Sequence, residues 1–190
     1  MTASLTEIPG YLAGTWAIDP THSSVEFTVR HLMISKVRGR FTTFEGRLVT
    51  AADPLESTVE ATIEIASVDT SNGQRDDHLR NADFFEVDKY PTMTYRSTGI
   101  HMEGGDFVLD GELTLKDVTQ TVPLTLQVHG FGPDYFLPDP QSGARAGFTA
   151  TGEVSRLAFG VGDNSPLPGG GLGLSDKVQI TLEIEAVLQK

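Results

Sequence analysis

Apolar and polar residues alternate along most of this 190-residue chain, which is the pattern of β-strands with one buried face. The pattern is clearest near the end of the chain, where every second residue of 178–186 is apolar and the residues between are mostly polar. The same alternation predicts strands over 25–33, 58–65, 92–100, 107–115, 122–128 and 144–154. The segment 36–50 is also strand-like, but Phe41 and Phe44 fall on opposite parities, which predicts a bulge near Thr42 and Thr43.

One segment, 66–91, interrupts this alternation. It starts with a turn-forming run in which Ser71 or Asn72 can cap the first turn of a helix. Apolar residues then recur at helical spacing, and Pro91 ends the segment because the residue before a proline is pushed out of the α region. We therefore predict a short helical excursion, about 71–86, laid over one end of the β-structure.

The order of these elements predicts an all-β fold. One-faced strands without helical crossovers between them form antiparallel sheets with one wet face. About eight long strands remove their exposed edges most easily by closing into a barrel. We expect an extended eight-stranded antiparallel β-barrel in a single domain over 1–190, with 1–15 as an N-terminal lead. A sandwich of two sheets is the alternative.

The interior of an eight-stranded barrel is either filled by side chains or holds one ligand. Several residues predicted to point inward are small: Ala61, Gly111, Ala144, Ala146, Ala150, Gly152 and Ala186. They either leave an elongated apolar cavity or make room for Trp16 and the ten phenylalanines. Composition alone does not decide between these two interpretations.

Charge and composition exclude several classes of function. The net charge of −12 argues against nucleic-acid binding and against docking on anionic lipid by overall charge. Without cysteine the chain has no disulfide, no thiolate zinc site and no cysteine nucleophile. No basic, apolar export signal opens the sequence, and no run approaches the roughly 20 apolar residues of a membrane-spanning helix. We therefore expect a cytoplasmic protein without a transmembrane segment.

Candidate catalytic chemistry is sparse. The five histidines are scattered without the spacing of a zinc site, and no serine has the surroundings of a nucleophile, so we predict no metal, no cofactor and no catalytic residue. His31 shares the apolar face of its strand, as either a core histidine bonded to the backbone or a polar marker at a cavity mouth. The charged run at 75–80 is either a solvated helix face or the lip of a pocket.

Five stretches carry a resemblance to a known family. They are WAIDPTHSSVEFTVRHL at 16–32, VRGRFTTFEGRL at 37–48, SVDTSNGQRDDHLRNADFFEVDKYPTMTYRS at 67–97, GELTLKDVTQTVPL at 111–124 and SRLAFG at 155–160. In these stretches the chain resembles the YceI-like family of bacterial lipid-binding proteins, from about Trp16 to the C-terminus. The resemblance implies a lipocalin-like barrel around a long apolar tunnel, a polyisoprenoid ligand such as an isoprenoid quinone or a polyprenyl phosphate, and a homodimer.

Strand parity and this resemblance together give candidate site residues. The predicted tunnel wall consists of Phe27, Val29, Phe41, Ile63, Leu109, Leu113, Phe148 and Ile180. The predicted mouth, which would select the polar head group, consists of His31, Arg38, Arg75, His78 and Arg156. Burial of an isoprenoid chain contributes about 0.8 kcal/mol per methylene equivalent, so an apolar wall is sufficient for affinity.

These observations favour a protein that binds, sequesters or carries an isoprenoid lipid without catalysis. Two alternatives stay open at this level. One is an enzyme acting on such a lipid, with His31 or His78 and a nearby aspartate as acid–base groups. The other is a stress-related barrel protein with a filled core.

Overall fold

The computed structural model describes residues 8–164 and 173–190, which form one twelve-stranded sheet with short helices. The strands are β1 Gly14–Ile18, β2 Ser24–His31, β3 Ser35–Phe41, β4 Phe44–Thr50, β5 Thr58–Glu64, β6 Val68–Asp69, β7 Thr92–Glu103, β8 Asp106–Leu115, β9 Val118–Thr121, β10 Leu124–Pro133, β11 Ala144–Ser155 and β12 Leu174–Leu188. The α-helix is α1 Gly73–Arg80, and single 3₁₀ turns are η1 Pro54–Glu56, η2 Ile65–Ser67, η3 Pro140–Ser142 and η4 Leu157–Phe159. No helix of the described residues is long and apolar enough to cross a membrane.

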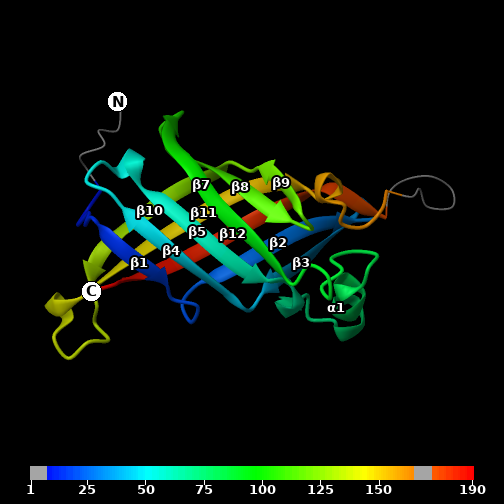
Figure 1. Cartoon of the computed structure of the whole chain (residues 1–190), viewed down its shortest axis with the longest axis horizontal. Coiled ribbons are helices and arrows are strands. Elements are labelled where there is room, and N and C mark those ends of the chain that lie inside the picture. The colour runs from blue at the N-terminus through cyan, green and yellow to red at the C-terminus, as the bar shows by residue number, and fades with distance from the viewer. Residues whose placement is uncertain (1–7, 165–172) are drawn as a thin grey trace.

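Eight strands close into an antiparallel barrel because β1 pairs with β4 on one side and with β12 on the other. The ring runs β1-β4-β5-β7-β8-β10-β11-β12 (Figure 1). β12 is long enough to pair with β2 along its first part and with β1 at its end, so β2, β3 and β6 extend the sheet past the ring. The predicted barrel is confirmed, and the sandwich alternative is wrong.

The parity change between Phe41 and Phe44 is a break between two strands and not a bulge. β3 ends at Phe41 and pairs with β2 and β6, whereas β4 begins at Phe44 and pairs with β1 and β5. Between them the Thr42 N–H donates to the Ser67 carbonyl at 3.2 Å, and the Glu64 N–H donates to the Thr43 carbonyl at 3.0 Å. The chain changes partners at this corner, which resets the alternation.

The helix is shorter than predicted, Gly73–Arg80, although Asn72 caps it as expected by accepting from the Arg75 N–H at 3.0 Å. The chain then turns, so Phe85 donates its N–H back to the Leu79 carbonyl at 3.0 Å. Leu79 and Phe85 both pack on the core, but Phe85 reaches it from the turn and not from the helix. Figure 1 shows α1 at one end of the long axis and the β4–β5 connection at the other.

The small inward residues serve both of the purposes that the sequence left open. Ala144, Ala146 and Ala186 surround Trp16, whose side chain is completely buried. A Cβ on Gly111 would lie 2.3 Å from the ring of Tyr95, so this glycine makes room for the tyrosine. In contrast, Ala61 and Ala150 face an open cavity inside the barrel.

A buried polar cluster holds α1 against the barrel. The Asp76 carboxylate accepts hydrogen bonds from the Thr70 N–H at 2.9 Å and from the Thr70 hydroxyl at 2.5 Å. Arg80 donates to the carbonyls of Ala66 and Val68 at 2.8 and 3.0 Å, which joins the helix to η2 and β6. A charged acceptor with two donors fixes the chain on either side of the Thr70 turn.

A second cluster lies at the opposite end of the ring. Arg145 on β11 contacts three carboxylates: Asp19 at 2.8 Å, Asp134 at 2.9 Å and Glu185 at 2.6 Å. Asp134 is buried, and the guanidinium also lies 4.5 Å from the ring centre of Phe136. The contacts therefore join the ends of β1, β10 and β12 around one cation.

Replacing Asp76 by asparagine should lower the free energy of unfolding by about 1–3 kcal/mol, because the buried site loses its charged acceptor. Urea denaturation of the intact chain measures this change. Asp77→Asn is the matched control, since the Asp77 side chain is 80% exposed. Among the described residues, Asp77 forms one ion pair, with Arg80. This control should change stability by less than about 0.5 kcal/mol, and equal losses in both variants would contradict a role for the buried cluster.

Arg145→Gln should cost about 3 kcal/mol of unfolding free energy at pH 7, since it leaves the buried Asp134 carboxylate without its cation. Arg145 holds the pKa values of Asp19 and Asp134 below their usual range, near 4 in the unfolded chain. A lowered folded pKa contributes stability above pH 4 that is lost as the pH falls. The difference in unfolding free energy between wild type and variant, measured by urea denaturation, should therefore be smaller at pH 3 than at pH 7.

The exposed pair of Lys177 and Glu153 offers the control for this experiment, because the Lys177 side chain is 73% exposed. Lys177→Gln should leave stability almost unchanged at either pH. A difference in unfolding free energy between wild type and Arg145→Gln that stays constant from pH 7 to pH 3 would contradict this prediction. It would show that Arg145 does not stabilise the fold through its contacts with the carboxylates.

Candidate functional site

The barrel encloses an apolar cavity of about 190 Å³. Aliphatic and aromatic side chains from strands on all sides of the ring form its wall, and the only charged residue that lines it among the described residues is Glu26. Lining residues occur from Val154 and Ile180 toward one end to Tyr11 and Ser57 at the other, but none of them belongs to α1 or η4. This arrangement suits a ligand that is mostly hydrocarbon.

The predicted wall residues lie mainly on this cavity. Its lining includes Phe27, Phe41, Ile63, Leu109, Leu113, Phe148 and Ile180. Val29 is not part of the lining, because it lies farther along β2, between Val37 and Val178 of the neighbouring strands. Their contact with a ligand stays a prediction.

Two lining residues come from the N-terminal segment 1–15, for which the sequence predicts no role in the site. Ile8 and Tyr11 line the cavity, and the Phe131 N–H donates to the carbonyl of Pro9 at 3.3 Å. The Tyr11 ring packs edge-on against the ring of Phe131, with 5.1 Å between centroids. An aromatic residue directly after a Pro-Gly turn is the sequence signal for this contact, but alternation does not detect it.

Polar lining groups gather at this same end of the cavity. The Tyr11 hydroxyl donates to the carbonyl of Ala51 at 2.7 Å and lies 3.3 Å from the Ser57 hydroxyl. The Thr50 hydroxyl accepts from the Trp16 indole N–H at 2.8 Å. These hydroxyls form the polar end of an otherwise apolar space, so they are the lining groups suited to a polar head group.

Tyr95 lies deeper in the cavity wall. Its hydroxyl donates to the carbonyl of Val122 at 3.1 Å, and the Leu109 carbonyl is 3.3 Å away. Burial raises the pKa of Tyr95 above its usual value, and the nearby charge of Asp110 adds to this effect. The phenol therefore stays protonated and is unsuited to act as a base.

The structure brings two predicted mouth residues together, but outside the barrel. Arg75 and His78 line a surface hollow beside α1 together with Asn72 and Gln74. Arg75 donates to the Thr70 hydroxyl at 2.6 Å and to the Thr70 carbonyl at 2.8 Å. Exposed His78 lies 3.3 Å from Asp83 and 5.0 Å from the ring of Phe84.

The other three predicted mouth residues lie elsewhere. Arg156 is buried, and it donates to the carbonyls of Val161, Asp163, Leu174 and Ser175 at 2.9–3.2 Å. Burial lowers the pKa of Arg156, and these four contacts tie the η4 turn to the start of β12. His31 and Arg38 are exposed on the β2–β3 hairpin.

The core-histidine alternative for His31 is wrong, because His31 lies near the tip of the hairpin, past the closed ring, where its side chain is exposed. None of the five predicted mouth residues lines the cavity. Their role toward a head group stays a prediction.

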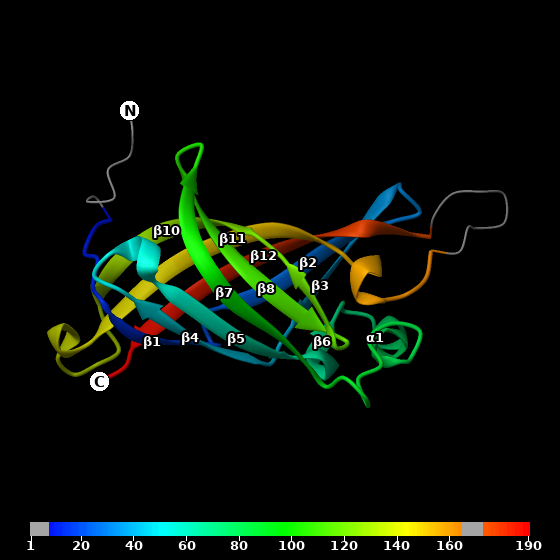
Figure 2. The ribbon, with the colours of Figure 1, turned by 45° about the horizontal axis from the view of Figure 1, so that its top comes forward.

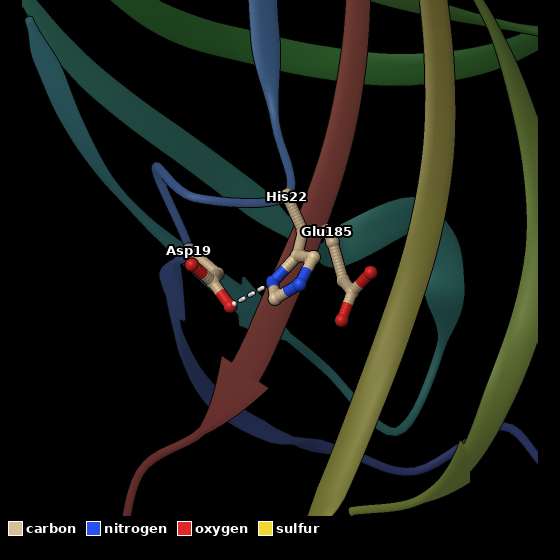
Figure 3. A group of neighbouring side chains, drawn as sticks. All are labelled: Asp19, His22 and Glu185. Atoms are coloured by element: carbon tan, nitrogen blue, oxygen red, sulfur yellow. Dashed lines mark hydrogen bonds and ion pairs between the residues drawn. The ribbon is translucent and has the colours of Figure 1, made fainter. Parts of the chain in front are cut away.

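One group of described side chains has the composition of a metal site. Asp19, His22 and Glu185 place a nitrogen and two oxygens within 4.8 Å of one another (Figure 3). Arg145 already contacts both carboxylates, and the Asp19 oxygen that it binds is the same one that lies 2.8 Å from the His22 ring nitrogen. A guanidinium in this position supplies the positive charge that a metal would bring, so the group is better suited to a structural ion-pair cluster.

Comparison of the barrel with solved structures identifies similar folds. The crystal structure of BcnA from Burkholderia cenocepacia matches with a TM-score of 0.74 over 88% of this chain and 98% of that one, at 24% sequence identity. A structure described as a polyisoprenoid binding domain from Saccharophagus degradans matches with a TM-score of 0.67 over 94% of this chain and 100% of that one, at 16% identity. At these identities the likeness shows a shared fold.

Sequence comparison shows the family. Protein YceI of Escherichia coli is 36% identical over 171 residues, which cover 89% of this chain and 83% of that protein. The family model for the YceI-like domain matches residues 16–186, from the buried Trp16 of β1 to the buried Ala186 of β12. The chain therefore belongs to the YceI-like family.

Proposed function

We propose that this protein binds an isoprenoid lipid, of the isoprenoid quinone or polyprenyl phosphate type, inside its barrel and sequesters or carries it without catalysis. The observation that carries the proposal is the enclosed cavity with its aliphatic and aromatic wall. The solved polyisoprenoid binding domain from Saccharophagus degradans has the same kind of barrel, which supports a chain-like lipid as the ligand class.

The physical basis for affinity is burial of hydrocarbon. Each methylene equivalent removed from water contributes about 0.8 kcal/mol, and the wall needs no polar contact to obtain it. Branched and aromatic side chains such as Ile63, Phe148 and Ile180 pack well against a methyl-branched chain. Affinity should therefore increase with the length of chain that fits inside.

The arrangement of titratable groups supports binding over catalysis. The histidine–aspartate pair of the enzyme alternative, His78 and Asp83, lies on the exposed surface beside α1 and not on the cavity. His31 is also exposed and outside the lining. Tyr95 lines the cavity, but as a protonated phenol already bonded to a carbonyl.

The filled-core alternative conflicts with the space inside the barrel. Ala61 and Ala150 leave part of the interior open, where larger side chains would fill it. Two further expectations, a cytoplasmic location and a homodimer, stay predictions, which cell fractionation and light scattering measure directly.

Ala150→Trp should abolish lipid uptake, because the indole would fill the cavity from β11. Native mass spectrometry after incubation with an isoprenoid quinone measures the bound fraction, which should fall at least tenfold. Ile63→Trp fills the cavity from β5 and should have the same effect. Overpacking should lower the unfolding free energy by about 1–3 kcal/mol without unfolding the protein.

The matched control is Thr151→Trp, which places the same side chain one residue farther along β11 on its exposed face. It should bind lipid like the wild type. Unchanged uptake in both cavity variants would contradict a binding site in the barrel, and conversion of the lipid by the wild type that is lost in His78→Ala would support the enzyme.

The position of the head group gives a separate prediction. Tyr11→Phe removes the hydroxyl at the polar end of the cavity. It should weaken the binding of a lipid with a polar head group by up to about tenfold. Binding of a purely hydrocarbon polyprenyl chain should stay the same. If Arg75→Gln or His78→Ala weakens the polar lipid and Tyr11→Phe does not, the head group lies at the α1 end instead.

A further inference from the structure

The β2–β3 hairpin ends in three exposed apolar residues. Leu32, Met33 and Ile34 are 40%, 51% and 82% exposed. Figure 2 shows this hairpin, in blue, projecting at the same end of the molecule as α1. Contiguous apolar side chains on a projecting tip are typical of a surface that docks on something else.

The backbone of the tip makes this choice of residues unusual. Leu32 and Met33 have φ angles of +52° and +61°, and the Ile34 N–H donates to the His31 carbonyl at 3.1 Å. A β-turn with positive φ at both central positions favours Asn-Gly and disfavours large side chains. Two bulky apolar residues therefore occupy positions that the turn itself would give to small or polar ones, which points to a role outside folding.

Positive charge surrounds this tip. Residues 30–41 contain Arg30, Lys36, Arg38 and Arg40 and no acidic residue. Arg30 lies directly across from Lys36, and Arg38 follows two residues later on the same outward face. Arg40 pairs with Asp69, whereas the other three form no ion pair with the described part of the chain. In a protein of net charge −12, this is a local concentration of unpaired cations.

A second exposed apolar patch lies on the loop after β10, but it lacks the positive charge of the hairpin. Tyr135 and Phe136 are 78% and 68% exposed on the loop at the opposite end of the long axis. Their loop carries Asp134 and Asp139 and Phe136 already packs over Arg145. Of these two exposed apolar patches, only the hairpin has unpaired positive charge beside it among the described residues.

We propose that the β2–β3 hairpin docks this protein on the surface of an anionic lipid membrane. Leu32, Met33 and Ile34 enter the interfacial region, and Arg30, Lys36 and Arg38 contact the lipid phosphates. The overall negative charge opposes such docking, so the hairpin has to supply the attraction locally, within about 8 Å at physiological ionic strength. The inference does not depend on which lipid occupies the barrel.

Vesicle co-sedimentation of the full chain tests this proposal. We expect the protein to bind vesicles that contain phosphatidylglycerol more tightly than vesicles of phosphatidylcholine alone, and the difference should shrink as salt is added. Replacing Arg30, Lys36 and Arg38 together by glutamine should weaken binding to the anionic vesicles on the order of a hundredfold.

The apolar tip is tested by the double variant Leu32→Asn, Met33→Gly. This pair suits the turn, so the variant should fold at least as well as the wild type. Vesicle binding should fall by about tenfold or more, while uptake of the isoprenoid quinone in solution stays the same, which separates docking from the cavity. Tyr135→Ser, on the acidic loop, is the matched control and should bind vesicles like the wild type.

Three results would overturn the proposal. The first is equal binding of the wild type to anionic and neutral vesicles, and the second is unchanged vesicle binding by the double variant. The third is light scattering that shows the double variant dissociating a dimer while it still binds vesicles, which would assign the tip to a second copy of the chain.

Discussion

The antiparallel pairing of β1 with both β4 and β12 is the constraint on which the rest of the structure depends. It leaves the eight strands of the ring without a free edge, so every inward side chain faces a closed interior. Trp16, at the centre of β1, is completely buried among small alanines and anchors this closure. An apolar cavity is possible only because the ring is closed around it.

The two ends of the barrel are held by different means. At the α1 end, the Asp76 carboxylate and Leu79, Phe84 and Phe85 hold the helix and its turn on the larger apolar cluster. At the other end, Arg145 joins the carboxylates of three separate elements. The polar hydroxyls of the cavity, on Tyr11 and Ser57, lie at the Arg145 end. Arg75 lies at the α1 end. The proposed lipid could therefore bind with its head group at either end, and the Tyr11 and Arg75 variants distinguish the two orientations.

The overall charge of the protein opposes binding to an anionic membrane, whereas the local charge of the β2–β3 hairpin favours it. The net charge of −12 argues against attraction to acidic surfaces, yet the β2–β3 hairpin carries unpaired cations beside an apolar tip. Electrostatic attraction to a membrane decays within a Debye length, so the charge nearest the surface outweighs charge on the far side of the molecule. Such a contact fits the proposed function, because an isoprenoid lipid outside the barrel stays in a bilayer.

The sequence by itself determined most of the long strands, the antiparallel barrel, a helix cap at Ser71 or Asn72 and the inward positions of Phe27, Ile63 and Ile180. Alternation and capping are local properties of the chain, whereas β1, which closes the ring, is not predicted as a strand. Only the tertiary structure decided what covers each end. His31 follows the inward parity but lies beyond the ring, and Arg156 is occupied by carbonyls of chain segments that come close only in the fold. Tyr11 enters the cavity wall through contacts with Phe131, and Arg145 meets Asp19 across 126 residues of sequence. Such contacts leave no periodic signal, because they join residues that local patterns treat separately.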